Sequence, residues 1–208
     1  MRSRLLGYAL FCAGAATFAF ATGKYALGAW QQQDARRAWN EAEARAIVAL
    51  ARRTVTADGL LSAPVVPGAP VARLLIPRLG LDEIVIEGVD DYSLNAGPGH
   101  LPGSAFPGEA GNSIISAHRD RHFSRLGGIN VGDTVITESG THRTRWVVQS
   151  KRVIAADAPA LFHTPDATLT LTTCWPIRYF GTAPDRLLVV AKPVGPPQNG
   201  TFAAANST

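Results

Sequence analysis

Cys174 is the residue of this sequence best suited to nucleophilic chemistry. It ends the run TLTLTTC at residues 168–174, in which threonine and leucine alternate. Because the side chains of a strand alternate between its two faces, Leu169, Leu171 and Thr173 share one face. Cys174 lies on the other face, with the remaining threonines. Free cysteine is among the most buried residue types, so a small buried hydrophobe and an accessible nucleophile both remain open as interpretations.

A thiol nucleophile needs a proton acceptor and a group that stabilises developing negative charge. The candidate acid and base is His118, at the end of the predicted strand 112–117. The candidate for charge stabilisation is Arg186, twelve residues after Cys174 at the start of the segment RLLVVA. An exposed arginine at the start of a strand is also ordinary, and Arg178 is a nearer alternative in a predicted loop.

The histidines argue against a metal centre. His118 and His122 are four residues apart, as in the zinc motif HExxH, but Arg119 takes the place of the glutamate and the segment follows a strand. The chain has two cysteines and no CxxC pair, so a cysteine zinc site is not expected either. We predict no metal and no cofactor. The other three histidines lie in predicted loops or turns and are expected at the surface: His100, His142 and His163.

An uncharged segment near the N-terminus predicts a membrane anchor. Residues 5–23, LLGYALFCAGAATFAFATG, carry no charge, and nineteen helical residues span about 28 Å, close to the hydrocarbon core of a bilayer. Arg2 and Arg4 precede it, which favours a cytoplasmic N-terminus and an exported remainder. The length favours an uncleaved anchor over a cleaved signal peptide. Because Cys12 lies inside this segment, Cys174 is expected to be an unpaired exported thiol.

The segment that follows the anchor predicts a second helix. In residues 30–53 the apolar side chains recur at helical spacing, with charges on the other faces. We interpret it as a juxtamembrane spacer that lies on the membrane or on the following domain, in preference to a helix that binds a partner. The chain is thus divided into an anchor, a juxtamembrane helix with a proline-rich linker, a catalytic domain and a disordered tail: 1–29, 30–71, 72–194 and 195–208.

The sequence of the third part, residues 72–194, predicts an all-β domain. Seven segments are rich in β-branched residues or leucine and are separated by Gly, Pro, Asn and Asp. Short helical turns are expected only near 122–126 and 158–162, and 90–111 is expected to be an irregular connection that runs over the barrel. Strands at this spacing indicate a β-barrel or a sandwich. The segments are 72–77, 83–89, 112–118, 132–138, 143–156, 168–174 and 186–191.

The charge pattern gives little support for nucleic-acid binding. The net charge is +4, and the basic residues gather in the segment after the anchor. No run of lysine and arginine is interleaved with stacking aromatics, which such binding needs. We therefore expect no nucleic acid among the partners.

Taken in order, these motifs resemble the sortase family over residues 72–192. The segments that carry the resemblance are LLIPRLGLDEIVIEGV, GPGHLPGSAFPGEAGNSIISAHRD, GDTVITE, TLTLTTCWP and RLLVVA. The Cys-Trp-Pro ending is similar to the proteobacterial branch of that family. The resemblance implies an eight-stranded sortase-like β-barrel with short helical turns, preceded by a transmembrane helix and a juxtamembrane helix.

The resemblance also implies an activity and a set of site residues. Cys174, His118 and Arg186 would form the catalytic set of a transpeptidase, with Thr173 and Ala117 beside the substrate. Such an enzyme cleaves an LPxTG-like sorting signal near the C-terminus of an exported protein through a thioacyl intermediate and transfers it to an amine acceptor. The implied location is the inner membrane, crossed once, with the catalytic domain on the extracytoplasmic side.

Two alternatives from other classes remain. A thiol peptidase could use the same three residues and let water resolve the thioacyl enzyme. A non-catalytic membrane-tethered domain could instead bind a partner, and its Cys174 would then be chemically ordinary. An L,D-transpeptidase is rejected, because that family places an arginine two residues after its cysteine, whereas Cys174 is followed by Trp-Pro-Ile.

Overall fold

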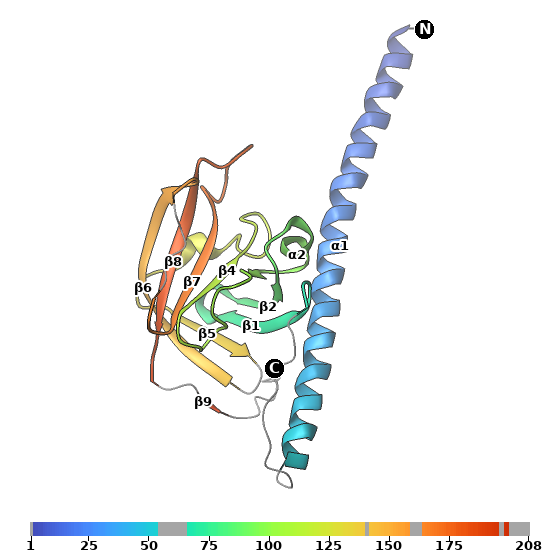
Figure 1. The fold of residues 1–208 in the computed structure, drawn as a ribbon. Coiled ribbons are helices and arrows are strands. Elements are labelled where there is room, and N and C mark those ends of the chain that lie inside the picture. Colours follow the sequence, from blue (N-terminus) through green and yellow to red (C-terminus); the bar gives the residue numbers. More distant parts are fainter. Residues whose placement is uncertain (1, 54–65, 140–141, 159–163, 196–197, 200–208) are drawn as a thin grey trace.

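The computed structural model describes residues 2–53, 66–139, 142–158, 164–195 and 198–199 (Figure 1). It consists of a long N-terminal helix beside a β-barrel. The helical elements are α1 (Arg2–Arg53), η1 (Pro77–Leu79), α2 (Asp91–Ala96) and η2 (Leu126–Gly128). The strands are β1 (Pro70–Ile76), β2 (Leu81–Glu87), β3 (Gly99–His100), β4 (Asn112–Ser116), β5 (Thr134–Ser139), β6 (His142–Ala155), β7 (Thr168–Trp175), β8 (Asp185–Pro193) and β9 (Gln198–Asn199).

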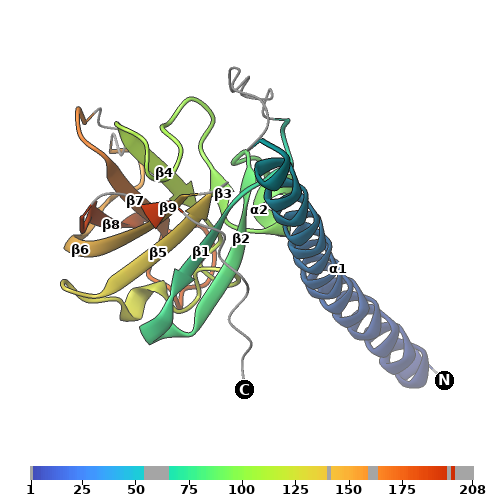
Figure 2. The ribbon, with the colours of Figure 1, turned by 90° about the horizontal axis from the view of Figure 1, so that it is seen from below.

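Eight strands close into a barrel, in the order β5-β1-β2-β3-β4-β7-β8-β6, and the pairing of β6 with β5 completes the circle. The pairs β2–β3 and β4–β7 are parallel, and the other pairs are antiparallel. The closed circle confirms the predicted eight-stranded barrel and excludes the sandwich. Figure 2 shows α1 on the β2 side of the barrel, with β6 and β8 on the opposite side.

The barrel is filled by the alternate residues of its strands, as the period of two requires. Leu169 and Leu171 of β7 lie opposite Ala191 and Val189 of β8, and all four side chains belong to one buried cluster. Trp146 lies in the same cluster and donates its indole N–H to Thr137 Oγ1 at 2.8 Å, which satisfies the polar atom of the ring.

All seven predicted strands are present, but four short elements were not predicted: η1, α2, β3 and β9. The two-residue strands β3 and β9 offer too few positions for a periodic pattern. Helix α2 lies inside the segment expected to be irregular, and its signal is Asp90, whose carboxylate accepts the backbone N–H groups of Tyr92 and Ser93 as an N-cap. The helical turn expected near 158–162 and the tail beyond residue 199 lie outside the described residues.

The predicted anchor and juxtamembrane helix form one continuous helix, α1, instead of two elements. No proline interrupts residues 2–53, and a single glycine costs a helix only about 1 kcal/mol, so nothing forces a break near residue 29. Its stretch Leu10–Ala42 is long and apolar enough to cross a membrane. The aromatic side chains of the first half, Phe11, Phe18 and Phe20, are more than 70% exposed in the isolated chain, which suggests an apolar surrounding for this half.

The second half of α1 packs on the barrel. Trp39 is 8% exposed and forms a small cluster with Ile84, Ile86 and Ala96. Gly28 permits the close approach, because a Cβ there would come within 2.9 Å of the Asn95 carbonyl oxygen. The juxtamembrane helix therefore lies on the following domain, one of the two placements expected for it.

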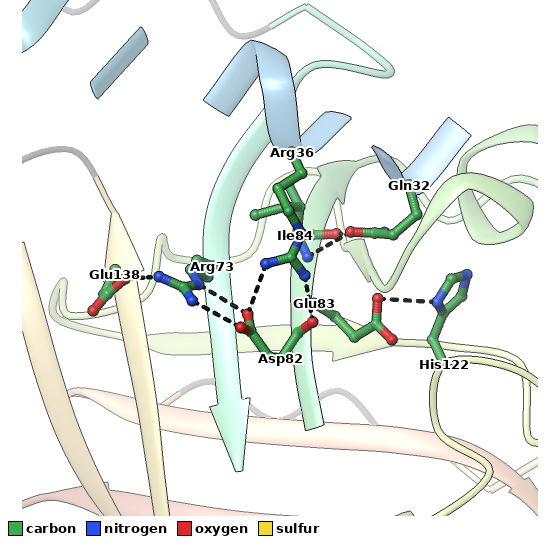
Figure 3. A network of polar contacts seen from close by, with 8 residues as sticks. All are labelled: Gln32, Arg36, Arg73, Asp82, Glu83, Ile84, His122 and Glu138. Atoms are coloured by element: carbon green, nitrogen blue, oxygen red, sulfur yellow. Dashed lines mark hydrogen bonds and ion pairs between the residues drawn. The ribbon is translucent and has the colours of Figure 1, made fainter. Parts of the chain in front are cut away.

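Polar side chains fasten α1 to β2 (Figure 3). The side-chain amide of Gln32 pairs with both backbone groups of Ile84, accepting its N–H at 2.8 Å and donating to its carbonyl at 3.3 Å, as a neighbouring strand would. Arg36 lies 3.3 Å from Asp82, whose carboxylate also binds Arg73 through two bonds of 2.7 and 2.8 Å. The Arg73 hydrogen bonds hold the pKa of Asp82 below its usual value against the opposing effect of burial.

Candidate active site

Cys174 and Arg186 lie on the neighbouring strands β7 and β8, and His118 lies just beyond the end of the adjacent strand β4. In the parallel pair β4–β7, Ser116 is level with Thr172, and the N–H of Ala117 still donates to the Thr172 carbonyl at 3.2 Å. The pairing therefore continues past the end of β4. One residue further along each chain, His118 follows Ala117 on one side and Cys174 follows Thr173 on the other.

Arg186 occupies the same row on the other side of Cys174. The two residues are directly opposite in the antiparallel pair β7–β8. Residues opposite each other in such a pair point to the same face, with Cβ atoms about 4.5–5.5 Å apart. Both side chains are exposed. A thiol and a permanent cation are thus neighbours on an accessible surface.

The face of β7 that carries Cys174 agrees with the alternation in the sequence. Thr173 is opposite Leu187 and, like Leu169 and Leu171, is buried on the core side of the strand. Cys174 points the other way and is the first exposed residue of β7. A small hydrophobe filling the core is therefore not the role of this cysteine.

The hydroxyl of Thr173 supports the segment that precedes the histidine. It donates a 2.7 Å hydrogen bond to the carbonyl of Ala117, and both residues are buried. This bond links β7 to the backbone immediately before His118. The prediction that Thr173 and Ala117 also contact substrate stays a prediction.

His118 is half-buried at the mouth of the barrel. Burial lowers its pKa below the usual value of 6.5, and the neighbouring Asp120 carboxylate opposes that effect only in part. The neutral imidazole is consequently the dominant form at neutral pH, while the imidazolium, when it forms, is a stronger acid than an ordinary histidine.

Arg119, next to the histidine, was not predicted as a site residue. Its guanidinium donates to three carbonyl oxygens of the loop between β7 and β8, those of Pro176 (3.4 Å), Tyr179 (3.1 Å) and Gly181 (2.7 Å). It also lies 5.7 Å from the centre of the Tyr179 ring. Arg119 therefore ties the loop that follows Cys174 to the segment that follows the histidine. The sequence gives its position beside His118 but not the direction of its side chain.

Two residues later, Arg121 connects the same segment to the helices. It donates to the carbonyls of Asn95 and Lys24, each at 3.4 Å, and lies 5.0 Å from the centre of the Tyr25 ring. The segment 118–122 is thus held between the β7–β8 loop on one side and α1 on the other.

His122 is paired with a carboxylate. Its Nδ1 lies 3.3 Å from Glu83 Oε2 (Figure 3). Among the described residues, no group of three or more histidine, cysteine, aspartate or glutamate side chains could hold a metal ion.

The prediction that His100 lies at the surface was wrong. This residue belongs to β3, between β2 and β4, and is 1% exposed. Its Nδ1 lies 2.7 Å from Glu87 Oε2, and its Nε2 lies 3.0 Å from the Ser104 hydroxyl and from the Ala105 carbonyl oxygen. It therefore fixes the 101–105 loop to the barrel. His142 is exposed in the β5–β6 hairpin, as predicted, and His163 lies outside the described residues.

Two hollows of about 520 and 530 Å³ lie elsewhere on the surface. The first lies between α1 and the barrel and is lined by residues that include Gln32, Arg36, Asp82 and Arg121; the second lies along 101–114. Neither hollow is lined by Cys174, His118 or Arg186. The candidate site is therefore identified by the types and the placement of these residues and not by the size of a cavity. Arg178 is exposed in the β7–β8 loop, whereas Arg186 is the arginine opposite the thiol.

Comparison with known proteins gives a consistent result. Residues 74–194 match the family model of the sortase domain. Over 124 residues the chain is 36% identical to Sortase D of Bacillus subtilis (strain 168); the match covers 58% of this chain and 62% of that protein, so the chain spans less than two thirds of this relative's length.

Two solved structures are similar to this chain. The catalytic domain of B. anthracis SrtD is 31% identical, with a TM-score of 0.55, and the match covers 67% of this chain and 97% of that one. A Clostridium perfringens Sortase D5 transpeptidase is 22% identical with a TM-score of 0.63, covering 82% of this chain and 99% of the other, which is a similarity of fold.

Proposed function

Because the chain belongs to the sortase family, we propose that it is a membrane-anchored cysteine transpeptidase. It cleaves an LPxTG-like sorting signal near the C-terminus of an exported protein and transfers the new C-terminus to an amine acceptor. The observation that carries the proposal is the exposed thiol of Cys174, which lies directly opposite Arg186. His118 follows the neighbouring strand β4 at the same level of the sheet.

In the first step the thiol of Cys174 gives its proton to the neutral imidazole of His118. The resulting thiolate attacks the carbonyl carbon of the scissile amide, and the carbonyl π electrons move to oxygen. The guanidinium of Arg186 is a permanent cation with fixed donors, suited to stabilise that oxyanion. The intermediate then collapses, the C–N bond breaks, and the imidazolium of His118 gives its proton to the departing amine. The product is a thioester on Cys174 and a neutral imidazole.

In the second step the acceptor amine attacks the thioester carbonyl. The neutral imidazole of His118 takes a proton from the amine, the C–S bond breaks, and Cys174 leaves as the thiolate. The imidazolium then returns its proton to the thiolate, which restores the starting protonation states. The lowered pKa of His118 fits both roles, because it makes the imidazolium a readier donor and keeps the base free at neutral pH.

The proposed placement puts the N-terminus in the cytoplasm and the barrel outside. It is supported by the exposed apolar first half of α1 and by Arg2 and Arg4 before it. The relatives reported above come from Bacillus and Clostridium, so the proteobacterial branch and an inner-membrane location stay predictions.

The test uses the full-length protein in detergent with a soluble peptide that carries an LPxTG-like signal, with and without an added amine, and mass spectrometry of the products. We expect an amide between peptide and amine with the wild type, none with Cys174→Ala, and a fall of about a hundredfold to a thousandfold with Arg186→Ala. Arg178→Ala is the matched control and should keep the wild-type rate.

The outcomes separate the alternatives. Hydrolysis that continues unchanged when the amine is present would identify a thiol peptidase. No product from any signal peptide, together with an unreactive Cys174, would favour a binding domain. Equal losses in the two arginine variants would refute the assignment of the oxyanion cation to Arg186.

A further inference from the structure

We propose that Arg178, Tyr179 and Phe180, the aromatic tip of the β7–β8 loop, contact the surface of the bilayer that α1 enters. The contact would hold the active site at the membrane. This inference rests on the membrane anchoring in the proposed function, and it assigns a second, independent point of contact with lipid. Three features support this contact: the level at which the bilayer meets α1, the side chains that hold the loop near that level, and the residue types of the tip.

Helix α1 leaves the apolar region at Lys24. The preceding residues 10–23 are exposed and uncharged, and Lys24 is the first charged residue after them. Tyr25 and Trp30, 54% and 60% exposed, follow within two turns. Tyrosine and tryptophan concentrate where a membrane helix meets water, so the interface of the bilayer lies at residues 24–30.

The end of the barrel that carries Cys174 and His118 is held beside residues 24–25 of α1. Arg121 donates to the Lys24 carbonyl at 3.4 Å, and its guanidinium lies over the Tyr25 ring. Arg119, two residues earlier, donates to the carbonyls of Tyr179 and Gly181 at 3.1 and 2.7 Å. Two residues span at most about 7 Å of backbone. A single short segment therefore connects the membrane end of α1 to the base of the aromatic tip.

The loop points toward the membrane. Figure 1 shows it at the end of the barrel from which the N-terminal half of α1 extends, and it reaches further in that direction than α2 does. Strand β8 runs from this loop to the opposite end of the barrel, where Val194 follows its last residue.

The side chains of the tip fit an interface between lipid and water. Phe180 is fully exposed, Tyr179 is 50% exposed and Arg178 is exposed. An apolar ring, an amphipathic ring and a cation together suit the headgroup region, where rings bury their apolar part and arginine meets anionic lipid. Because Arg119 binds the loop backbone and not its side chains, apart from one face of Tyr179, the tip remains free to make that contact.

The direct test is depth-dependent fluorescence quenching. Full-length Phe180→Trp and, as the matched control, Val194→Trp are reconstituted in phosphatidylcholine–phosphatidylglycerol vesicles with and without brominated acyl chains. Val194 is also an exposed apolar residue, 53% exposed, at the other end of β8. After subtraction of the wild-type signal, we expect bromine to quench the tryptophan at 180 strongly and the one at 194 not at all. Equal signals at the two positions would overturn the proposal.

Two further measurements separate this inference from the proposed function. The first is alkaline extraction of the vesicles, which tests only whether α1 spans the bilayer. Release of the protein would contradict the anchoring. Retention of the protein without quenching at position 180 would contradict only the contact of the tip. Phe180→Ser should cleave a soluble signal peptide at the wild-type rate but a membrane-anchored substrate severalfold more slowly. An equal loss with the soluble peptide would mean that the ring contacts substrate, and would overturn the lipid assignment.

Discussion

The hydrogen bond between Thr173 and the Ala117 carbonyl is expected to hold His118 in place, and Thr173→Val tests it. Valine keeps the shape of threonine but removes the donor. The bond is 2.7 Å long and buried, and its acceptor is the carbonyl of the residue immediately before His118. Both the stability of the barrel and the position of the histidine should therefore change.

The magnitude follows from burial. Loss of one partner of a buried hydrogen bond costs about 1–3 kcal/mol. For a domain of this size, 1 kcal/mol shifts the melting temperature by about 4 °C, so Thr173→Val should melt about 4–12 °C lower than the wild type. A displacement of His118 by about 1 Å would lower kcat/KM by up to about a hundredfold.

Thr172 provides a matched control on the same strand. Its hydroxyl is buried and, within the described part of the chain, has no hydrogen-bond partner. Thr172→Val removes an unsatisfied polar atom, so its melting temperature should stay the same or rise. Thr173→Ser keeps the donor and should keep most of the activity.

The assay is thermal unfolding by circular dichroism together with peptide cleavage, on all three variants of the full-length protein in detergent. If Thr173→Val melts within about 2 °C of Thr172→Val and cleaves at the same rate, the bond does not position the histidine and the reasoning is refuted.

Three further predictions concern the β7–β8 loop, the protonation of His118 and the packing of α1. Arg119→Lys should lower kcat/KM and speed hydrogen exchange at the amides of residues 179–181, because a lysine carries all its donors on one nitrogen, whereas two guanidinium nitrogens of Arg119 reach the three carbonyls. Unchanged exchange would contradict this role of Arg119. The C–H resonances of His118 should titrate in NMR with a midpoint below 6.5. Because the unfolded chain then binds a proton at His118 more readily than the folded chain, the contribution of His118 lowers the free energy of unfolding as the pH falls below about 6.5. A titration midpoint above 6.5 would contradict the lowered pKa and reverse this pH dependence. Trp39→Ala should destabilise the packing of α1 by about 3 kcal/mol and expose α1 to proteolysis after residue 24, while a digestion pattern like that of the wild type would refute a docked helix.

The strands and the face of Cys174 could be predicted because each depends on local periodicity. The alternation of leucine and threonine in 168–174 states directly which residues share a face, and the structure has the same assignment. The juxtaposition of Cys174 with Arg186 depends on the register of β7 with β8. The level of His118 depends on a parallel pairing across more than fifty residues. Local pattern specifies neither. Residue chemistry made His118 and Arg186 candidate partners of Cys174, and the resemblance to a family implied that the three residues form one catalytic set.

The features that were missed depend on contacts between distant segments. His100 looks like a loop residue because β3 has only two residues, and its burial follows from pairing with β2 and β4. The direction of Arg119 depends on where the β7–β8 loop lies. The apolar stripe of α1 indicates that the helix packs on something, whereas the partner, β2 with α2, follows only from the fold.

The most direct test of the central claim is the mass of the intact enzyme during turnover. Full-length protein is mixed with a signal peptide, quenched in acid and measured beside Cys174→Ala. We expect an added mass equal to the N-terminal peptide fragment, located on Cys174, absent from the variant and lost when an amine is added. Product formation without any adduct on Cys174, or an adduct that persists in Cys174→Ala, would contradict this expectation.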